Sequence, residues 1–487
     1  MSPSVESFNE DKYKALMDGL ECTEISLSNL ERTRRIDSEF YKKECLIISQ
    51  ILKDINAVPI TDFLDVSDGN HMTISDRFQP KGIPYYRGQD IHNFFIESAS
   101  PIYIDEGAFN NPYMLRSHIK KGDVLLSIVG TIGESALVFS DRKATCSCKL
   151  AILRPTSTIF SPLLVIYLKT KYGINQIDKF KRGAVQMGYL LEDMNQLLIP
   201  YFSQNFIKHI AGVVNRIHCI MEESGNAYKK AKEILSEVIG FTSNNYSSEQ
   251  TAIKTFSESF ASTGRLDAEY YQPKYDDLFT ILRKQISKPL GQLVSTMKSI
   301  EPGSEYYGDA GVPFIRVSDV SITGIDNPSI MIPESVEPNI DRLYPKKDTI
   351  LFSKDGSVGI AFKITEDMKA ITSSALLHLR VNNTSEILPD YLTLILNSEI
   401  VQLQAERDAS GAIIQHWKLS DIEKVVIPIL PYDMQLEIAK KVQQSFLLRK
   451  KANDLIQIAV KAVELAIEDS EEIASKWLEE NTRLLEG

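Results

Sequence analysis

The stretch Arg35-Ile36-Asp37-Ser38-Glu39-Phe40-Tyr41 decides the fold, because it occurs twice. It returns in the second half of the chain as Arg265-Leu266-Asp267-Ala268-Glu269-Tyr270-Tyr271. Other segments repeat in the same order: Gly82 to Arg87 matches Gly311 to Arg316, Lys121 to Ser127 with Gly130 and Gly133 matches Lys347 to Ser353 with Gly356 and Gly359, and Leu198 to Pro200 matches Val426 to Pro428. The sequence therefore predicts two tandem copies of one structural unit.

The composition is that of a soluble chain with more than one domain. The 487 residues exceed what one hydrophobic core usually supports, and hydrophobic and charged residues make up 43% and 24%. No apolar run approaches the roughly 18 residues of a membrane span, and residues 1–18 lack the apolar stretch of a signal peptide. We therefore expect a cytoplasmic protein. The net charge of −11 argues against a chain that coats nucleic acid by itself, but it allows a local basic surface.

The five cysteines predict neither a disulfide framework nor a metal site. Their number is odd, and Cys146-x-Cys148 is the one close pair. It has no second pair or nearby histidine that would complete a tetrahedral site. We expect a reduced pair on a strand and no metal bound by this chain.

Residues 59–203 have the pattern of a mixed α/β domain. Short apolar pieces alternate with Gly, Pro, Asn and Asp, which is typical of strands joined by turns, and one helix is expected over 162–179. A helix is also expected to begin near Asp37 as its N-cap. The predicted organisation is an N-terminal segment and helix at 1–58, a first α/β domain at 59–203, a central long helix at 204–242, a linker at 243–264, a helix that opens the second repeat at 265–288, a second α/β domain at 289–432 and a C-terminal long helix at 433–487.

After residue 204 the apolar residues repeat at spacings of three and four, which is a heptad seam. The seam skips one position, Ser224, and continues in the C-terminal helix of the second copy. An apolar stripe also fits a helix packed on its own domain, but the length favours an extended helix of roughly 50 Å. The seam residues are Ile210, Val214, Ile217, Met221, Leu235, Leu448, Ala452 and Leu455.

The predicted fold class is therefore mixed α/β. Two tandem α/β domains are separated by long helices that pair as an antiparallel coiled coil with pseudo-two-fold symmetry. Equivalent helices in two repeats can pair in this way and hold two domains a fixed distance apart.

The sequence contains no recognisable catalytic signature. Asn110-Asn111-Pro112-Tyr113 has one proline where the loop of an amino-methyltransferase needs two, so we interpret it as a turn. The glycine pairs Gly130/Gly133 and Gly356/Gly359 are not followed by the Lys-Ser/Thr of a phosphate loop, and they also predict turns. The seven histidines are scattered. We expect a chain without catalytic activity.

Polar and basic residues recur instead at matching loop positions of both copies. Arg and Gln can make paired hydrogen bonds to guanine and adenine edges, and Asp can accept from cytosine. Each of these residues alone would be interpreted as part of a solvated loop. Because polar residues recur at equivalent positions while the residue types differ, we favour one scaffold that reads two different DNA sequences. The candidate DNA-binding residues are Arg87, Gln89, Asp90, Ser127, Lys181, Arg182 and Gln186 in the first copy, and Arg316, Ser318, Asp319, Ser353, Lys354, Asp355, Gln415 and His416 in the second.

The order of these motifs resembles the specificity (S) subunit of Type I restriction–modification systems, also written HsdS. The resemblance rests on the repeated Arg-Ile/Leu-Asp-x-Glu-Phe/Tyr-Tyr, on the Lys-x-Asp-x-Leu/Ile-Leu…Gly-x-x-Gly block and on the apolar-Ile-Pro step into each long helix. It covers the chain from about residue 30. The first copy departs at Tyr201-Phe202-Ser203, where it lacks the second proline of Ile427-Pro428-Ile429-Leu430-Pro431.

The resemblance implies two target-recognition domains, each of which reads one half of a split, asymmetric site in double-stranded DNA. It implies that the chain docks methyltransferase subunits, two in number, and it leaves open whether restriction/translocase subunits join them. It further implies that the partners methylate an adenine, and that S-adenosylmethionine, Mg and ATP are bound by the partners and not by this chain. Two alternatives stay open: a specificity subunit of another methylation-based phage-defence assembly, and a coiled-coil scaffold that does not bind DNA. An enzyme of unknown type is a third class.

Overall fold

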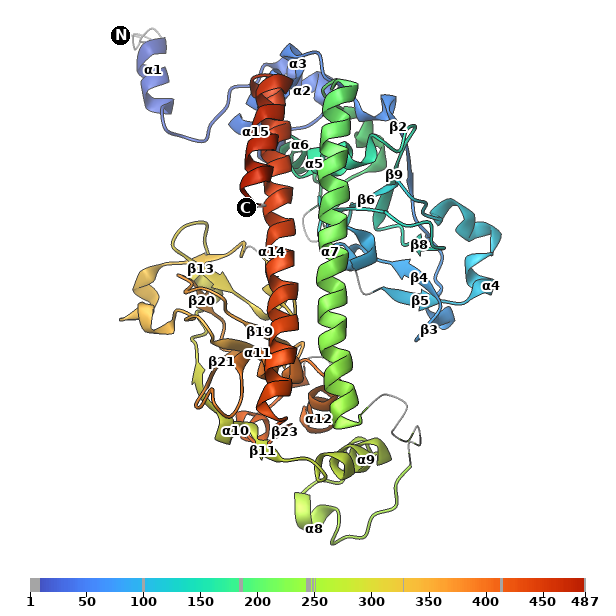
Figure 1. Cartoon of the computed structure of the whole chain (residues 1–487). Coiled ribbons are helices and arrows are strands. Elements are labelled where there is room, and N and C mark those ends of the chain that lie inside the picture. Colours follow the sequence, from blue (N-terminus) through green and yellow to red (C-terminus); the bar gives the residue numbers. More distant parts are fainter. Residues whose placement is uncertain are drawn as a thin grey trace. The chain divides into compact units, whose positions relative to one another are not determined.

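The computed structural model describes residues 9–98, 101–183, 187–241, 247, 249, 251–326, 328–411 and 415–485 (Figure 1). It divides into two compact units: unit 1 comprises Met1–Cys219 and Lys451–Gly487, and unit 2 comprises Ile220–Lys450. The boundary falls within both long helices, α7 (Gln204–Ile239) and α14 (Tyr432–Glu468). Each unit therefore contains one α/β repeat and a segment of each long helix.

Unit 1 is built on two four-stranded sheets. The first has the order β2-β9-β6-β7, formed by Leu64–Asp68, Leu150–Pro155, Val124–Ser127 and Ser135–Leu137, and all its neighbours are antiparallel. The second has the order β3-β5-β4-β8, formed by Phe78–Gln79, Ile102–Ile104, Ile83–Tyr86 and Thr145–Cys146, and β4 and β8 are parallel. A short pair, β1 (Val58–Pro59) and β10 (Leu198–Ile199), joins the two ends of the domain.

Unit 2 repeats this topology. The sheet β12-β21-β17-β19 is formed by Val294–Lys298, Leu376–Val381, Ile350–Ser353 and Ala361–Lys363, and β11 (Ser287–Pro289) pairs with β23 (Val426–Pro428). The sheet β16-β13-β20 is formed by Met331–Ile332, Val312–Ile315 and Ile371–Thr372. The register is also kept, because Val124 faces Leu153 in the first repeat as Ile350 faces Leu379 in the second. The predicted tandem repeat is confirmed.

The main sheet of unit 2 buries one face against helices of the same unit. In unit 2, Leu377 and Leu379 of β21 share a core with α11 (Pro389–Leu396), α12 (Glu399–Asp408) and the segments of α7 and α14. Side chains alternate along a strand, so His378 and Arg380 lie on the opposite face of the same sheet.

The helix expected over 162–179 is in fact two helices, α5 (Ser161–Leu168) and α6 (Lys171–Phe180). The break occurs because Thr170 adopts an extended conformation, and its side chain accepts a hydrogen bond from the backbone N–H of Gly173. This is an N-cap for α6. Pro162 lies in the first turn of α5, as expected.

The other helix boundaries also differ from the sequence prediction. Asp37 is not the N-cap of an α-helix, because its carboxylate accepts from Arg35 Nε at 2.7 Å; a 3-10 turn follows at Ser38–Tyr41, and α3 spans Lys43–Asp54. The helix that opens the second repeat, α9, spans Pro273–Leu282. The single helix predicted over 433–487 is divided into α14 and α15 (Glu471–Leu484), because Ser470 caps the second one through Ile473 N. Part of the linker at 243–264 lies outside the described residues.

The long helices pair through the predicted seam. Unit 2 contains the C-terminal part of α7 and the N-terminal part of α14, and unit 1 contains the other two parts, as expected of antiparallel helices. Two predicted seam residues, Met221 and Leu448, are only half-buried, and Ile220 takes the buried place of Met221. The fully buried seam residues are Ile210, Val214, Ile217, Leu235, Ala452 and Leu455.

Ser224, which the sequence pattern skipped, belongs to the seam. It is fully buried, and its hydroxyl donates to the Ser445 carbonyl at 2.8 Å and lies 3.0 Å from the Ser445 hydroxyl. A buried polar side chain is tolerated when it has a hydrogen-bond partner, so the serine pair continues the contact between the helices.

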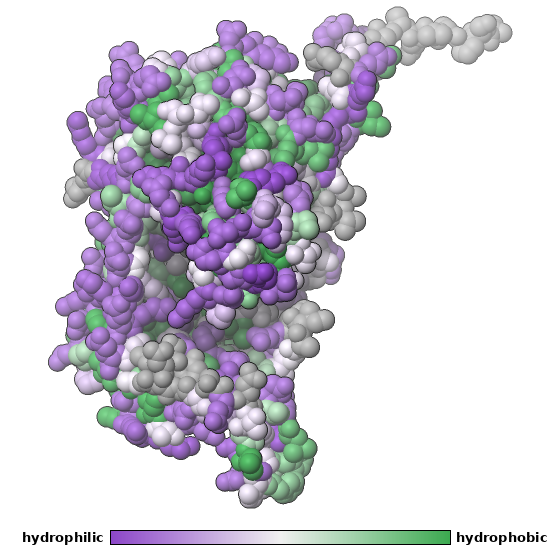
Figure 2. All heavy atoms as spheres, turned by 90° about the vertical axis from the view of Figure 1, so that its right-hand side faces the viewer, coloured by the Kyte–Doolittle hydropathy of each residue, from purple (hydrophilic) through white to green (hydrophobic). Residues whose placement is uncertain are grey.

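Hydrophilic residues cover most of the face shown in Figure 2, and hydrophobic residues lie in scattered groups between them. Among the described helices, none is both long and apolar enough to cross a membrane.

Candidate nucleic-acid interface

The repeated motif that opens each copy is a structural clamp. Arg35 donates to Asp37 and its guanidinium lies 4.7 Å from the centre of the Phe40 ring; in the second copy Arg265 donates to Asp267 and lies 4.4 Å from the Tyr270 ring. The hydrogen bond from each arginine lowers the pKa of its aspartate. The motif therefore stabilises a turn in both repeats, which explains why the chain keeps it twice.

A second recurring pair is also internal to each repeat. The Asp90 carboxylate accepts from Arg87 Nε at 3.1 Å, from Arg87 Nη2 at 3.0 Å and from the Arg87 backbone N–H at 2.8 Å. Arg316 and Asp319 repeat this arrangement, with the backbone bond again at 2.8 Å. Asp90 is buried and both of its oxygens are used, so the prediction that it accepts from a base is corrected to a role in fixing Arg87.

The two candidate serines next to the glycine turns are buried as well. The Ser127 hydroxyl lies 3.2 Å from the Thr131 hydroxyl, and the Ser353 hydroxyl donates to the Ser357 carbonyl at 2.6 Å. Gly130, Gly133, Gly356 and Gly359 all have positive φ, between 74° and 100°, which confirms the tight turns. Ser127 and Ser353 organise these turns from the interior, which corrects their assignment to a DNA surface.

Lys181 and Arg182 lie at the surface but have acidic partners. Arg182 Nη2 donates to both carboxylate oxygens of Asp193 at 2.7 Å, and its side chain keeps 41% of its exposure. Burial raises the pKa of Asp193 even though Arg182 opposes the shift. Lys181 pairs with Asp178. The remaining candidate of this loop, Gln186, lies outside the described residues.

In the second repeat, several candidates lie on or next to a short two-stranded sheet. Strands β18 (Asp355–Gly356) and β22 (Gln415–His416) pair, the exposed His416 Nδ1 lies 2.9 Å from Asp355 Oδ1, and Lys354 also pairs with Asp355. The Ser318 hydroxyl is exposed and donates to Asp319 at 3.0 Å. Asp355 therefore links Lys354 and His416 on the short sheet.

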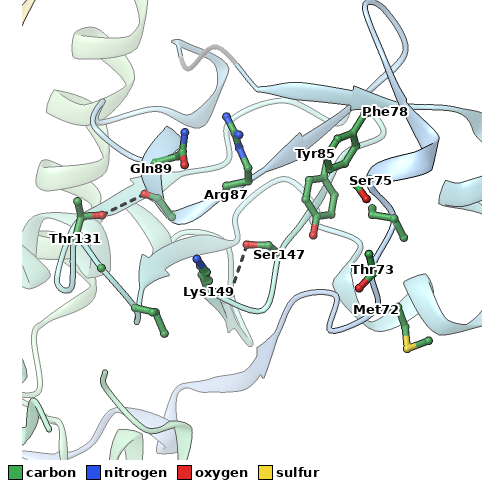
Figure 3. Close-up of a pocket in the computed structure, with 14 residues that line it drawn as sticks. Met72, Thr73, Ser75, Phe78, Tyr85, Arg87, Gln89, Thr131, Ser147 and Lys149 are labelled. Atoms are coloured by element: carbon green, nitrogen blue, oxygen red, sulfur yellow. Dashed lines mark hydrogen bonds between the residues drawn. The ribbon is translucent and has the colours of Figure 1, made fainter. Parts of the chain in front are cut away.

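The first repeat contains a hollow of about 480 Å³ that brings Arg87 and Gln89 together with Lys149 (Figure 3). Two aromatic rings, Phe78 and Tyr85, form its opposite side, with their centroids 6.0 Å apart. We call this the first-repeat hollow. Its lining residues are Met72, Thr73, Ile74, Ser75, Phe78, Tyr85, Arg87, Gly88, Gln89, Val129, Gly130, Thr131, Ser147 and Lys149.

Sequence reasoning found Arg87 and Gln89 but missed Lys149 and the two rings. Lys149 is exposed and has no side-chain partner among the described residues. The equivalent residue of the second copy is Ala375. Ile128 N donates to the Lys149 carbonyl, and Lys354 N donates to the Ala375 carbonyl in the same way. This difference between the two copies was the signal in the sequence that could have drawn attention to Lys149. The two repeats therefore keep one framework and differ in charge at this point.

The first-repeat hollow has the chemical groups that nucleic acid binds. An ammonium and a guanidinium attract phosphate oxygens or guanine, an amide can pair with adenine, and aromatic faces can stack on bases. Within the described residues, no group of three or more His, Cys, Asp or Glu side chains is placed to hold a metal ion.

Comparison with known proteins identifies the class of the second repeat. Residues 288–457 match the model of the Type I restriction modification DNA specificity domain. The chain therefore carries a domain of this family, and the resemblance to Type I specificity subunits is confirmed.

The chain is also similar to individual proteins and solved structures. The specificity subunit of the Type I restriction enzyme EcoBI from Escherichia coli is 24% identical over 209 residues, which are 41% of this chain and 44% of that protein. The match thus spans less than half the length of this curated relative. Among solved structures, the S subunit of a Type I restriction–modification system from M. genitalium is 17% identical over 87% of this chain and 96% of that one, with a TM-score of 0.34. The HsdS subunit from Thermoanaerobacter tengcongensis is 16% identical over 88% and 95%, with a TM-score of 0.26.

Proposed function

We propose that this protein is the DNA-recognition subunit of a Type I restriction–modification complex. The single observation that carries the proposal is a duplicated α/β domain, one copy of which matches a DNA specificity domain, with different charges at equivalent positions of the two copies. Each repeat reads one half of a split, asymmetric DNA site. The first-repeat hollow contributes Lys149, Gln89 and its aromatic side to one half.

The chain itself performs no catalysis in this proposal. Two adenine methyltransferase subunits, and in the restricting form a translocase/endonuclease subunit, dock on its helices. S-adenosylmethionine, Mg and ATP are bound by these partners. The specificity subunit supplies geometry, since it holds the methyltransferases at two half-sites on one duplex.

The direct test is to map methylated adenines in the host genome with the gene intact and deleted. We expect a two-part motif to lose its methylation in the deletion strain and to regain it on complementation. A scaffold without a DNA role would leave the methylation map unchanged, and the purified complex would then show no salt-dependent binding to duplexes that carry the motif.

Exchange of residues 59–203 for the equivalent region of a relative is expected to change one half of the methylated motif and to keep the other half. The reason is that the first repeat has its own sheets, cores and hollow within unit 1. Sequencing of methylated positions measures the result. A change in both halves, or in neither, would contradict modular recognition.

Insertion of one heptad into α7 after Ile220, with a matching heptad in α14, is expected to change the number of unread base pairs between the half-sites. Seven residues add about 10 Å to a helix, which is about three base pairs of rise. The half-sites themselves should stay the same, because neither repeat is altered. If the methylated motif kept its spacer, the helices would not set the distance.

A further inference from the structure

The second repeat contains a hollow of about 210 Å³ on the outer face of its main sheet, at the end of β21 away from the glycine turn. Three cations, Arg342, Lys346 and Arg380, line it together with the buried His378. We call it the second-repeat cation hollow. Its other lining residues are Ser295, Thr296, Met297, Tyr344 and Thr349, so no carboxylate is part of its wall.

Comparison of the two repeats shows which carboxylates are present in the first copy and absent from this hollow. Arg154 of β9 is the counterpart of Arg380 of β21. Arg154 is paired with Asp65 of β2, and Arg380 is paired with Ser295 at the equivalent position of β12. In the first copy, Arg154 Nε donates to Asp123 Oδ1 at 2.8 Å and Arg154 Nη2 donates to Asp123 Oδ2 at 2.7 Å. Thr349 stands where Asp123 stands, since the two residues make the same backbone hydrogen bonds. Arg380 therefore lacks the carboxylate that neutralises its counterpart.

Two further carboxylates disappear in the same way. Arg116 pairs with Asp68 in the first copy, and Asp65 faces Arg154 across the strands. The second copy has Lys298 in place of Asp68 and Ser295 in place of Asp65, whereas Arg116 is kept as Arg342. Lys120 is likewise kept as Lys346. The second copy therefore has the cations of the first copy but not the carboxylates that pair with them there.

The remaining acidic neighbours do not replace them. Arg342 donates to Glu337 at 2.7 Å, and Lys346 lies 3.4 Å from Asp367, both outside the wall of the hollow. Among the described residues, the Arg380 side chain has no hydrogen-bond or ion-pair partner, although its charge acts on Asp367 at longer range and helps to lower the pKa of that carboxyl. The free donors of Arg380, together with the positive charges of Arg342 and Lys346 that line the same hollow, attract an anion.

A buried polar atom gives a second, independent indication. His378 is 2% exposed, its Nε2 lies 2.8 Å from the Thr372 hydroxyl, and its Nδ1 has no partner within the described structure. The first copy has the apolar Ile152 at this position, which needs no partner. An unsatisfied buried nitrogen is costly, so a group that bonds it from the hollow would stabilise the site.

We propose that the second-repeat cation hollow binds a phosphate-type oxyanion, which takes the place of the Asp123 carboxylate of the first repeat. The volume of about 210 Å³ is below that of pockets for larger organic ligands and suits a phosphate group with a few waters. Arg380 provides a fork of donors that matches the oxyanion, Lys346 adds charge, and the Thr349 hydroxyl adds a donor. The phosphate is either free, as in inorganic phosphate or a nucleotide, or part of a nucleic-acid backbone.

Titration of the full-length chain with inorganic phosphate tests the proposal, with sodium chloride at matched ionic strength as the reference. We expect saturable binding by calorimetry in the wild type. Thr349→Asp, which installs the residue of the first repeat, should weaken phosphate binding at least about tenfold, because the new carboxylate occupies Arg380. Thr384→Asp adds the same charge on an exposed loop outside the hollow and should leave the affinity unchanged.

Arg380→Gln is the second variant, and it should lower the affinity for phosphate by a similar factor without adding a charge. A duplex oligonucleotide is the second arm. If Thr349→Asp weakens duplex binding and phosphate competes with the duplex, the anion is a backbone phosphate; if duplex binding is unaffected, it is a free phosphate compound. Absence of saturable phosphate binding in the wild type, or equal affinity in all four proteins, overturns the proposal.

Discussion

Replacing Lys149 by glutamate is expected to weaken DNA binding by the assembled complex about 10- to 100-fold. Lys149 is the exposed cation of the first-repeat hollow that has no side-chain partner among the described residues. Its replacement removes one favourable contact and places a negative charge beside the phosphate backbone or a base edge. Fluorescence anisotropy with a duplex that carries the methylated motif measures the loss.

The choice of Lys149 over Arg87 follows from the contacts. Arg87 is held by Asp90 through three hydrogen bonds, so its removal would also disturb the turn and confuse binding with folding. Lys120→Glu is the matched control, since Lys120 is exposed and does not line the hollow. An equal loss of affinity in the control would mean that net charge, and not the hollow, decides binding.

The salt dependence distinguishes two versions of this prediction. If Lys149 contacts a phosphate, the slope of log affinity against log salt should fall by about one in the variant, and sequence preference should be kept. If it contacts a base, the slope should change little, and discrimination at one position of one half-site should relax. Unchanged affinity and unchanged discrimination would remove the first-repeat hollow from the DNA interface.

The sequence predicted the architecture well because the chain is duplicated, so the pattern of apolar residues in one copy could be compared with the pattern in the other. Val124 and Ile350 lie in equal registers, so one pattern of apolar residues had to be compatible with one sheet twice. Helix ends were less predictable. The break at Thr170 depends on a local capping hydrogen bond, and the periodicity of the apolar residues runs straight across it.

The candidate site residues were predicted less well, because the presence of a polar residue in the sequence does not show whether its side chain is exposed or buried. Asp90 and Ser127 are residue types that are common in binding loops, but in the structure both side chains are buried and make hydrogen bonds within a turn. For Ser224 the prediction was wrong in the opposite direction. The sequence pattern left it out of the seam because it is polar, but it is buried there and its hydroxyl donates to the Ser445 carbonyl. Lys149 was missed because nothing in its neighbours indicates that Arg87 lies across the same hollow.

The comparison of the two repeats supplies what one copy does not. At Leu137 and Lys363, which face Val124 and Ile350, an apolar residue of the first repeat is replaced by a charge in the second. Lys363 is buried, and its ammonium lies 3.1 Å from Asp390 Oδ2 and 3.2 Å from Asp348 Oδ1. Asp390 also accepts from Gln443 of α14 at 2.8 Å. This buried network joins the sheet of unit 2 to the long helix of the same unit.

Asp390→Ala is therefore expected to destabilise unit 2 by about 3–5 kcal/mol, because it leaves the Lys363 ammonium buried with only the half-exposed Asp348 as a partner. Urea denaturation can be followed by the fluorescence of Trp417, which is buried in unit 2, in a Trp477→Phe background that removes the other tryptophan. The double variant Lys363→Leu/Asp390→Ala should recover a large part of the loss, since Leu137 shows that the fold accommodates an apolar residue there. If the double variant were less stable than Asp390→Ala alone, the cost would lie in the lost volume and not in the isolated charge.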